Sequence, residues 1–162
     1  MAVGTVSGVN PDDTWQLVSS QSASGASITF SSLSGIYKEL MISYRNVITS
    51  ATCGLAVRFN GDSTNYNYGG TAVWQAQYSE VAISYIPLTA YGAYTDHANG
   101  WMKVKNTNSA MPHTVEGGGY VADSINGLYN PSTAAVISSV IVKPNNSANF
   151  SSGTIELWGI PA

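Results

Sequence analysis

The clearest pattern along the chain is an alternation of apolar and polar residues with a period of two. Residues 55–59 read Leu-Ala-Val-Arg-Phe, and residues 101–105 read Trp-Met-Lys-Val-Lys. Every second side chain of an extended strand lies on the same face, so this period is typical of half-buried β-strands. The pattern predicts strands at 15–18, 28–30, 37–47, 55–59, 81–86, 101–105, 115–122, 134–143 and 154–158. Residues 66–78 are rich in Tyr, Gly and Gln, and could form a strand or a long loop.

Clusters of Gly, Asn and Pro separate these segments, and helical periodicity is nearly absent. Asn60 and Gly61 predict a tight hairpin turn, because both residues tolerate positive φ. The spacing predicts an all-β fold of about eight strands, arranged as an antiparallel, jelly-roll-like β-sandwich. No linker divides the chain, so residues 14–162 are expected to form a single β-sandwich domain. Residues 1–13 are expected to be a flexible N-terminal arm, which is either simply disordered or contacts a neighbouring protein.

Charged residues make up only 9% of the chain, against about 25% in an average soluble domain. The net charge is −3, and the six Lys and Arg residues are scattered. The basic patch of a nucleic-acid-binding protein is therefore missing, and binding to anionic membranes is equally unsupported. No apolar run approaches the roughly 20 residues of a membrane span, and the first residues lack the features of a signal peptide. A polar surface with few charges is easily desolvated, which suits a protein that lies against a partner.

The chain carries no recognisable catalytic motif, so it is expected not to be an enzyme. Cys53 is the single cysteine and is expected to be a small buried residue. His97 and His113 are both expected in exposed loops rather than as catalytic bases. No metal-ligand spacing and no phosphate-binding loop are present, so no metal and no cofactor are expected. The nine acidic residues are spread out, although a pair of carboxylates could still meet in space and support a polysaccharide-degrading enzyme.

Aromatic residues are strongly tilted toward Tyr and Trp, with ten Tyr and four Trp against three Phe. Both side chains combine an apolar body with a polar tip, which suits interfaces. One stretch of the chain is crowded with such residues, namely Tyr66, Tyr68, Trp74, Tyr78, Tyr91 and Tyr94. Of these, Trp74, Tyr78, Tyr91 and Tyr94 are expected to contact a partner or a glycan. That stretch has three open interpretations: a platform on which sugars stack, a subunit interface, or ordinary core packing.

Several segments resemble a group of small structural proteins of tailed-phage virions. Residues 28–40 resemble their opening strands, and Leu55 to Asp62 resembles their Leu-x-x-Arg-Phe-Asn-Gly-Asp segment. Residues 134–142 and 149–160 are similar to their last two strands, with Trp158 where those proteins often have Tyr. The middle third of the chain carries no such similarity. The resemblance implies a jelly-roll-like sandwich, often a homotrimer, on the outside of a virion, and it brings no catalytic residues.

Two functions follow from the resemblance and the composition together. The first is a capsid decoration (cement) protein that binds and stabilises the shell of the major capsid protein. The alternative is a tail-fibre or receptor-binding tip domain that recognises a glycan on the host surface. In either case the protein is expected on the surface of the virion, after synthesis in the host cytoplasm.

Overall fold

The computed structural model describes residues 14–72, 75–89, 97–119, 122–131 and 135–162. The expected arm at 1–13 lies outside them. The described chain is all-β, as the alternating pattern predicts, and it contains twelve strands rather than about eight. The strands are β1 (Gln16–Ser22), β2 (Ile28–Phe30), β3 (Tyr37–Thr49), β4 (Leu55–Phe59), β5 (Tyr66–Ala72), β6 (Gln75–Ile83), β7 (Ile86–Pro87), β8 (Ala98–Lys105), β9 (His113–Gly119), β10 (Ala122–Tyr129), β11 (Val140–Pro144) and β12 (Phe150–Pro161).

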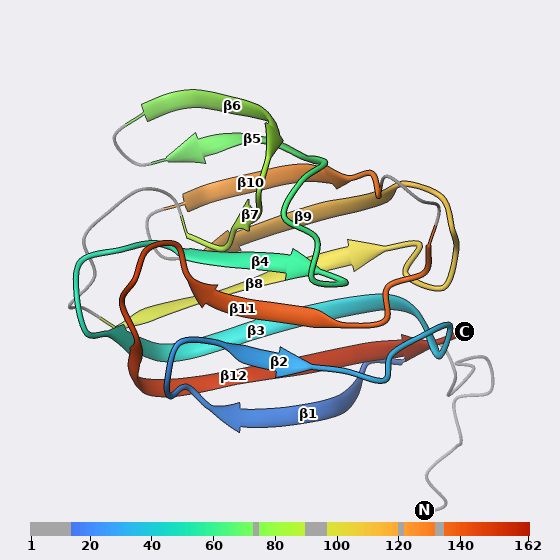
Figure 1. Cartoon of the computed structure of the whole chain (residues 1–162), viewed down its shortest axis with the longest axis horizontal. Coiled ribbons are helices and arrows are strands. Elements are labelled where there is room, and N and C mark those ends of the chain that lie inside the picture. Colours follow the sequence, from blue (N-terminus) through green and yellow to red (C-terminus); the bar gives the residue numbers. More distant parts are fainter. Residues whose placement is uncertain (1–13, 73–74, 90–96, 120–121, 132–134) are drawn as a thin grey trace, which may run out of the picture.

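The strands form two antiparallel sheets that pack as a sandwich. The large sheet has eight strands in the order β1-β12-β3-β8-β9-β10-β5-β6. The small sheet has four strands in the order β2-β11-β4-β7. Figure 1 shows the small sheet lying across one part of the large sheet, with β5 and β6 extending beyond it. The predicted antiparallel sandwich is confirmed.

Strands from the two ends of the chain pair in a nested sequence. β1 pairs with β12, β2 with β11, β3 with β8, and β4 with β7, all antiparallel. Successive pairs alternate between the sheets: β1–β12 and β3–β8 belong to the large sheet, and β2–β11 and β4–β7 belong to the small sheet. β5 and β6 are inserted between β4 and β7, and β9 and β10 between β8 and β11. These four inserted strands are what widen the large sheet.

The core lies between the sheets, where the apolar residues of each alternating strand meet. Val57 and Phe59 of the small sheet are fully buried, as are Ile42 and Met102 of the large sheet. Each buried side chain of this size contributes roughly 1.5–3 kcal/mol relative to an exposed one. Because successive side chains of a strand point to opposite faces, the residues next to these core residues point outward. Those of the large sheet form its outer face.

Glycines in β8 and β9 make room for a tyrosine that links the two layers. Gly100 and Gly119 lie directly opposite each other in the ladder. A Cβ atom at either position would lie 2.2 or 2.4 Å from the hydroxyl oxygen of Tyr44. That hydroxyl donates a hydrogen bond of 2.8 Å to the carbonyl of Leu88. Gly100 and Gly119 therefore leave the space that the buried hydrogen bond from Tyr44 to Leu88 requires.

The turn at Asn60 is confirmed, but the hairpin predicted around it is wrong. Asn60 and Gly61 have φ of 56° and 74°, and the amide of Asp62 donates to the carbonyl of Phe59 at 3.0 Å. However, β4 pairs with β11 and β7, whereas β5 pairs with β10 and β6. The turn therefore carries the chain from the small sheet to the large one.

Two predicted strands have different bounds in the structure. The strand predicted at 134–143 begins at Val140, because the preceding backbone is bonded outside any ladder: Ile137 donates to the carbonyl of Thr107 at 2.9 Å. The strand predicted at 81–86 is divided, because the chain leaves the large sheet after Ile83 and enters the small sheet at Ile86. The uncertain segment at 66–78 belongs to β5 and β6, with residues 73 and 74 outside the described part.

Candidate functional site: the outer face of the large sheet

A row of side chains crosses the outer face of the large sheet from its β1 edge. The ladder places Leu17 opposite Trp158, Trp158 opposite Met41, and Met41 opposite Lys103. All four point outward, because their neighbours Leu40, Ile42, Met102 and Leu157 point into the core. Trp15 and Trp101 flank this row. We call the group the tryptophan patch, and it consists of Trp15, Leu17, Met41, Trp101, Lys103 and Trp158.

The tryptophan patch combines exposed apolar surface with one ammonium group. Leu17 is 51% exposed and Trp101 is 40% exposed. The Nζ of Lys103 lies 5.3 Å from the ring centroid of Trp101 and 5.9 Å from that of Trp15. Such cation–π contacts contribute about 0.5–1 kcal/mol at exposed sites, so Lys103 favours one arrangement of the two rings.

Polar contacts also orient the third tryptophan. The indole Nε1 of Trp158 donates to Oε2 of Glu156 at 3.2 Å, and the other carboxylate oxygen lies 2.5 Å from the guanidinium of Arg45. Glu156 is only 9% exposed, so its charge is largely covered by these neighbours. Charge-assisted bonds of this kind hold side chains more firmly than neutral ones. Each of the three tryptophans of the patch is therefore held by a hydrogen bond or a cation–π contact within the protein.

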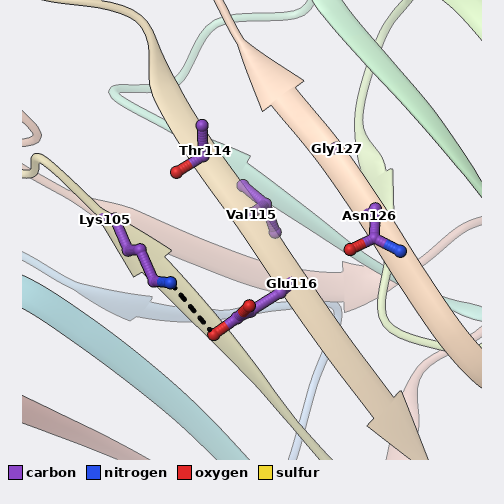
Figure 2. A pocket seen from close by; sticks show the side chains of 6 residues that line it. All are labelled: Lys105, Thr114, Val115, Glu116, Asn126 and Gly127. Atoms are coloured by element: carbon purple, nitrogen blue, oxygen red, sulfur yellow. Dashed lines mark ion pairs between the residues drawn. The ribbon is translucent and has the colours of Figure 1, made fainter.

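A polar groove lies beside the tryptophan patch, over the inserted strands. It has a volume of about 300 Å³ and is lined by Lys105, Thr114, Val115, Glu116, Asn126 and Gly127. Figure 2 shows Lys105 of β8 and Glu116 of β9 reaching toward each other, with Asn126 on the next strand, β10. The Nζ of Lys105 lies 3.4 Å from Oε1 of Glu116, and both side chains are more than 40% exposed. The groove therefore offers donors and acceptors to solvent without a net charge.

Most of the residues predicted to bind a partner lie where the structure gives no test. Trp74, Tyr91 and Tyr94 are outside the described residues. The backbone of Tyr78 belongs to β6, opposite Gly70, but its side chain is not among those described. Binding through these four residues therefore stays a prediction.

Other tyrosines of the same stretch belong to the core. Tyr66 is fully buried, stacks on Tyr129 with ring centroids 4.8 Å apart, and Tyr129 stacks on His113 at 5.5 Å. The hydroxyl of Tyr129 donates to a carboxylate oxygen of Asp62. Burial raises the pKa of both tyrosines well above the usual value, so neither ionises near neutral pH. Core packing is the correct interpretation for Tyr66.

His113 contradicts its predicted exposure, because it is fully buried in β9. Its Nδ1 lies 3.0 Å from the carbonyl of Asn106, and its Nε2 lies 3.1 Å from that of Ala135. A neutral ring has one N–H and donates to only one of these carbonyls at a time. The pKa of His113 is lowered, mainly because burial disfavours the charged form of the ring. The alternation of residues 113–117 was the available signal, since it gives His113 and Val115 the same face.

Two of the remaining predictions about reactive groups are confirmed. Cys53 is buried as expected, and His97 is exposed as expected. Among the described residues, no group of three or more His, Cys, Asp and Glu is placed to hold a metal ion. A search of the same residues finds no helix of the length and apolarity that a membrane span requires.

Reasoning from the sequence passed over the tryptophan patch, although the signal was present. Trp101 has the same parity as Lys103 and Lys105, whose outward direction the alternation predicts. Trp158 likewise shares its parity with Glu156. What the sequence lacks is the strand order, which places β1, β12, β3 and β8 side by side.

The chain was compared with protein families, curated proteins and solved structures, and no relative was found. The chain matches no protein-family model, no curated protein and no solved structure.

Proposed function

We propose that this protein is a non-enzymatic structural subunit of a tailed-phage virion, and that it decorates the capsid by docking its tryptophan patch onto the major capsid protein. The observation that carries the proposal is the exposed, ordered apolar surface at Leu17 and Trp101. Four large apolar side chains are exposed among the described residues, and two of them lie in this patch.

The composition of the tryptophan patch suits a protein partner. Tryptophan is enriched among the residues that dominate binding energy, and charged residues are depleted at the centre of interfaces. The patch holds three of the four tryptophans of the chain and a single ammonium group, that of Lys103. An apolar surface that persists on a folded protein commonly marks a place where another protein binds.

The strand order supports the same assignment. A nested pairing of eight strands in two four-stranded layers supports the proposed jelly-roll-like arrangement, which viral capsid proteins among others use. Here the layers are β1-β12-β3-β8 and β2-β11-β4-β7, with the inserted strands added at one edge. The fold is compatible with several functions, so the docking surface and the resemblance carry the particular one. As that resemblance implies, the proposed subunit is a homotrimer.

The test uses capsids assembled without this protein, to which purified protein is added. Trp101→Ala should weaken binding by about thirtyfold, because truncating an anchoring tryptophan typically costs about 2 kcal/mol. Met111→Ser is the matched control, because Met111 is 65% exposed and lies outside the patch. Equal binding of both variants would refute docking through the tryptophan patch.

A receptor-binding tip domain is the second candidate, and the polar groove is the observation that favours it. Its donors and acceptors are exposed on β8 and on the inserted strands β9 and β10, and they face solvent as a glycan site requires. Variants of Trp74 and Tyr78 test the prediction, made from the sequence, that these residues contact a host glycan. Trp74→Ala or Tyr78→Ala should reduce adsorption to host cells without unfolding the protein, and unchanged adsorption would remove these residues from the account.

A further inference from the structure

We propose that the polar groove and the adjoining ring of Trp101 together bind an uncharged saccharide. The inference rests on the receptor-binding candidate, in which the tryptophan patch is not covered by the capsid. The site lies over β8, β9 and β10, so the two strands inserted before β11 supply most of it.

The charges of the groove favour a ligand without net charge. The ammonium of Lys105 and the carboxylate of Glu116 pair at 3.4 Å and cancel each other, and Asn126 and Thr114 are neutral. The remaining charge at the site is the ammonium of Lys103, which lies 5.3 Å from the ring centroid of Trp101 and makes a cation–π contact there. An anionic ligand would meet the Glu116 carboxylate, and a cationic ligand would meet Lys105. A polyhydroxylated ligand satisfies both, because a hydroxyl donates to a carboxylate and accepts from an ammonium group.

The shape of the face connects the groove to Trp101. In the ladder Glu116 lies opposite Lys103, and Gly118 lies opposite Trp101. Gly118 has no side chain to fill the space beside the indole. Positions two residues apart on one strand are separated by roughly 6.8 Å. A sugar ring over Gly118 can therefore contact the 40% exposed indole while its hydroxyls reach toward Glu116.

The groove also provides fixed partners rather than a flexible loop. Lys105, Glu116 and Asn126 stand on three neighbouring strands, so their separation is set by the ladder. Binding groups that are held in place before the ligand arrives lose less conformational entropy on binding. This arrangement is expected to distinguish sugars by the spacing of their hydroxyls.

The experiment is a titration of ¹⁵N-labelled full-length protein with glucose, galactose and N-acetylglucosamine, each in turn, followed by NMR. At least one sugar should shift the amide signals of residues 114–118 and 126 and the indole N–H signal of Trp101. Glu116→Gln should weaken that binding at least about tenfold and Thr114→Ala about fivefold, because a hydrogen bond to a charged group contributes more than one between neutral groups. Thr29→Ala is the matched control, because Thr29 is an exposed threonine in the small sheet.

The outcomes separate this inference from the function on which it rests. No shift with any of the three sugars, or shifts centred elsewhere, would overturn the saccharide site. Adsorption of virions that carry Glu116→Gln tests the receptor-binding function independently. Loss of adsorption without sugar binding would leave receptor binding standing and refute the saccharide, whereas sugar binding with unchanged adsorption would support the site and refute the receptor role.

Discussion

Asn60 joins the turn after β4 to the segment that precedes β11. Its side-chain amide makes four hydrogen bonds to that segment. Its Oδ1 accepts hydrogen bonds from the amides of Ser138 and Ser139 at 2.7 and 3.3 Å and from the Ser138 hydroxyl at 3.0 Å. Its Nδ2 donates to the carbonyl of Val136 at 3.0 Å. Replacing Asn60 should therefore detach two segments that are far apart in the sequence.

The magnitude follows from the groups left without partners. Asn60→Gly keeps the positive φ of 56° without strain but leaves the Ser138 amide and the Val136 carbonyl unpaired. Each net hydrogen bond contributes about 1 kcal/mol, and somewhat more where the orphaned group stays buried, so the free energy of unfolding should fall by about 2–3 kcal/mol. Asn60→Ala should lose about 1 kcal/mol more, because a Cβ disfavours the left-handed region.

Urea unfolding measures this difference as a shift of the midpoint at constant m-value. Asn65→Gly is the matched control, because Asn65 also has positive φ, 69°, and among the described residues its side chain donates a hydrogen bond to the exposed Thr64 hydroxyl alone. The control should change stability by a few tenths of a kcal/mol at most. If Asn60→Gly destabilised the protein no more than Asn65→Gly, the proposed role of this amide as a joint would be wrong.

Three further predictions concern the core, pH and the arm. Gly119→Ala should lower stability by about 1–3 kcal/mol in thermal unfolding, because the added Cβ would lie 2.4 Å from the Tyr44 hydroxyl; wild-type stability would contradict the packing. His113 has a lowered pKa when folded, so the unfolded chain takes up its proton first as pH falls below about 6.5. Stability should then decline by up to about 1.4 kcal/mol per pH unit, and that part of the slope should vanish in His113→Gln. Deleting residues 1–13 should weaken capsid attachment and leave the unfolding temperature unchanged, and undiminished capsid occupancy would exclude an attachment role for the arm.

The alternation of apolar and polar residues predicts much of the fold, because it decides locally which side chains face the core. It gives β4, most of β3 and β8, and the central part of β12. It does not predict where the chain changes sheets. The Asn60 turn was expected to close a hairpin, but β4 finds better partners in β11 and β7, which lie far along the chain. Such long-range pairing is a tertiary property that a local turn signal does not specify.

The site was less predictable for a related reason. The tyrosine-rich stretch attracted attention because its aromatic residues are close in sequence, yet Tyr66 and Tyr68 are core residues. The tryptophan patch is built instead from positions 15, 101 and 158, which only the strand order brings together. His113 shows the same limit, because its burial depends on stacking against Tyr129 of the next strand.

The most direct test of the decoration proposal is the copy number of this protein in purified virions, measured by quantitative mass spectrometry against the major capsid protein. A decoration subunit that docks through the tryptophan patch should be present in hundreds of copies, in fixed ratio to the capsid lattice. A few to a few tens of copies would contradict capsid decoration and place the protein on the tail, where receptor binding would be its function.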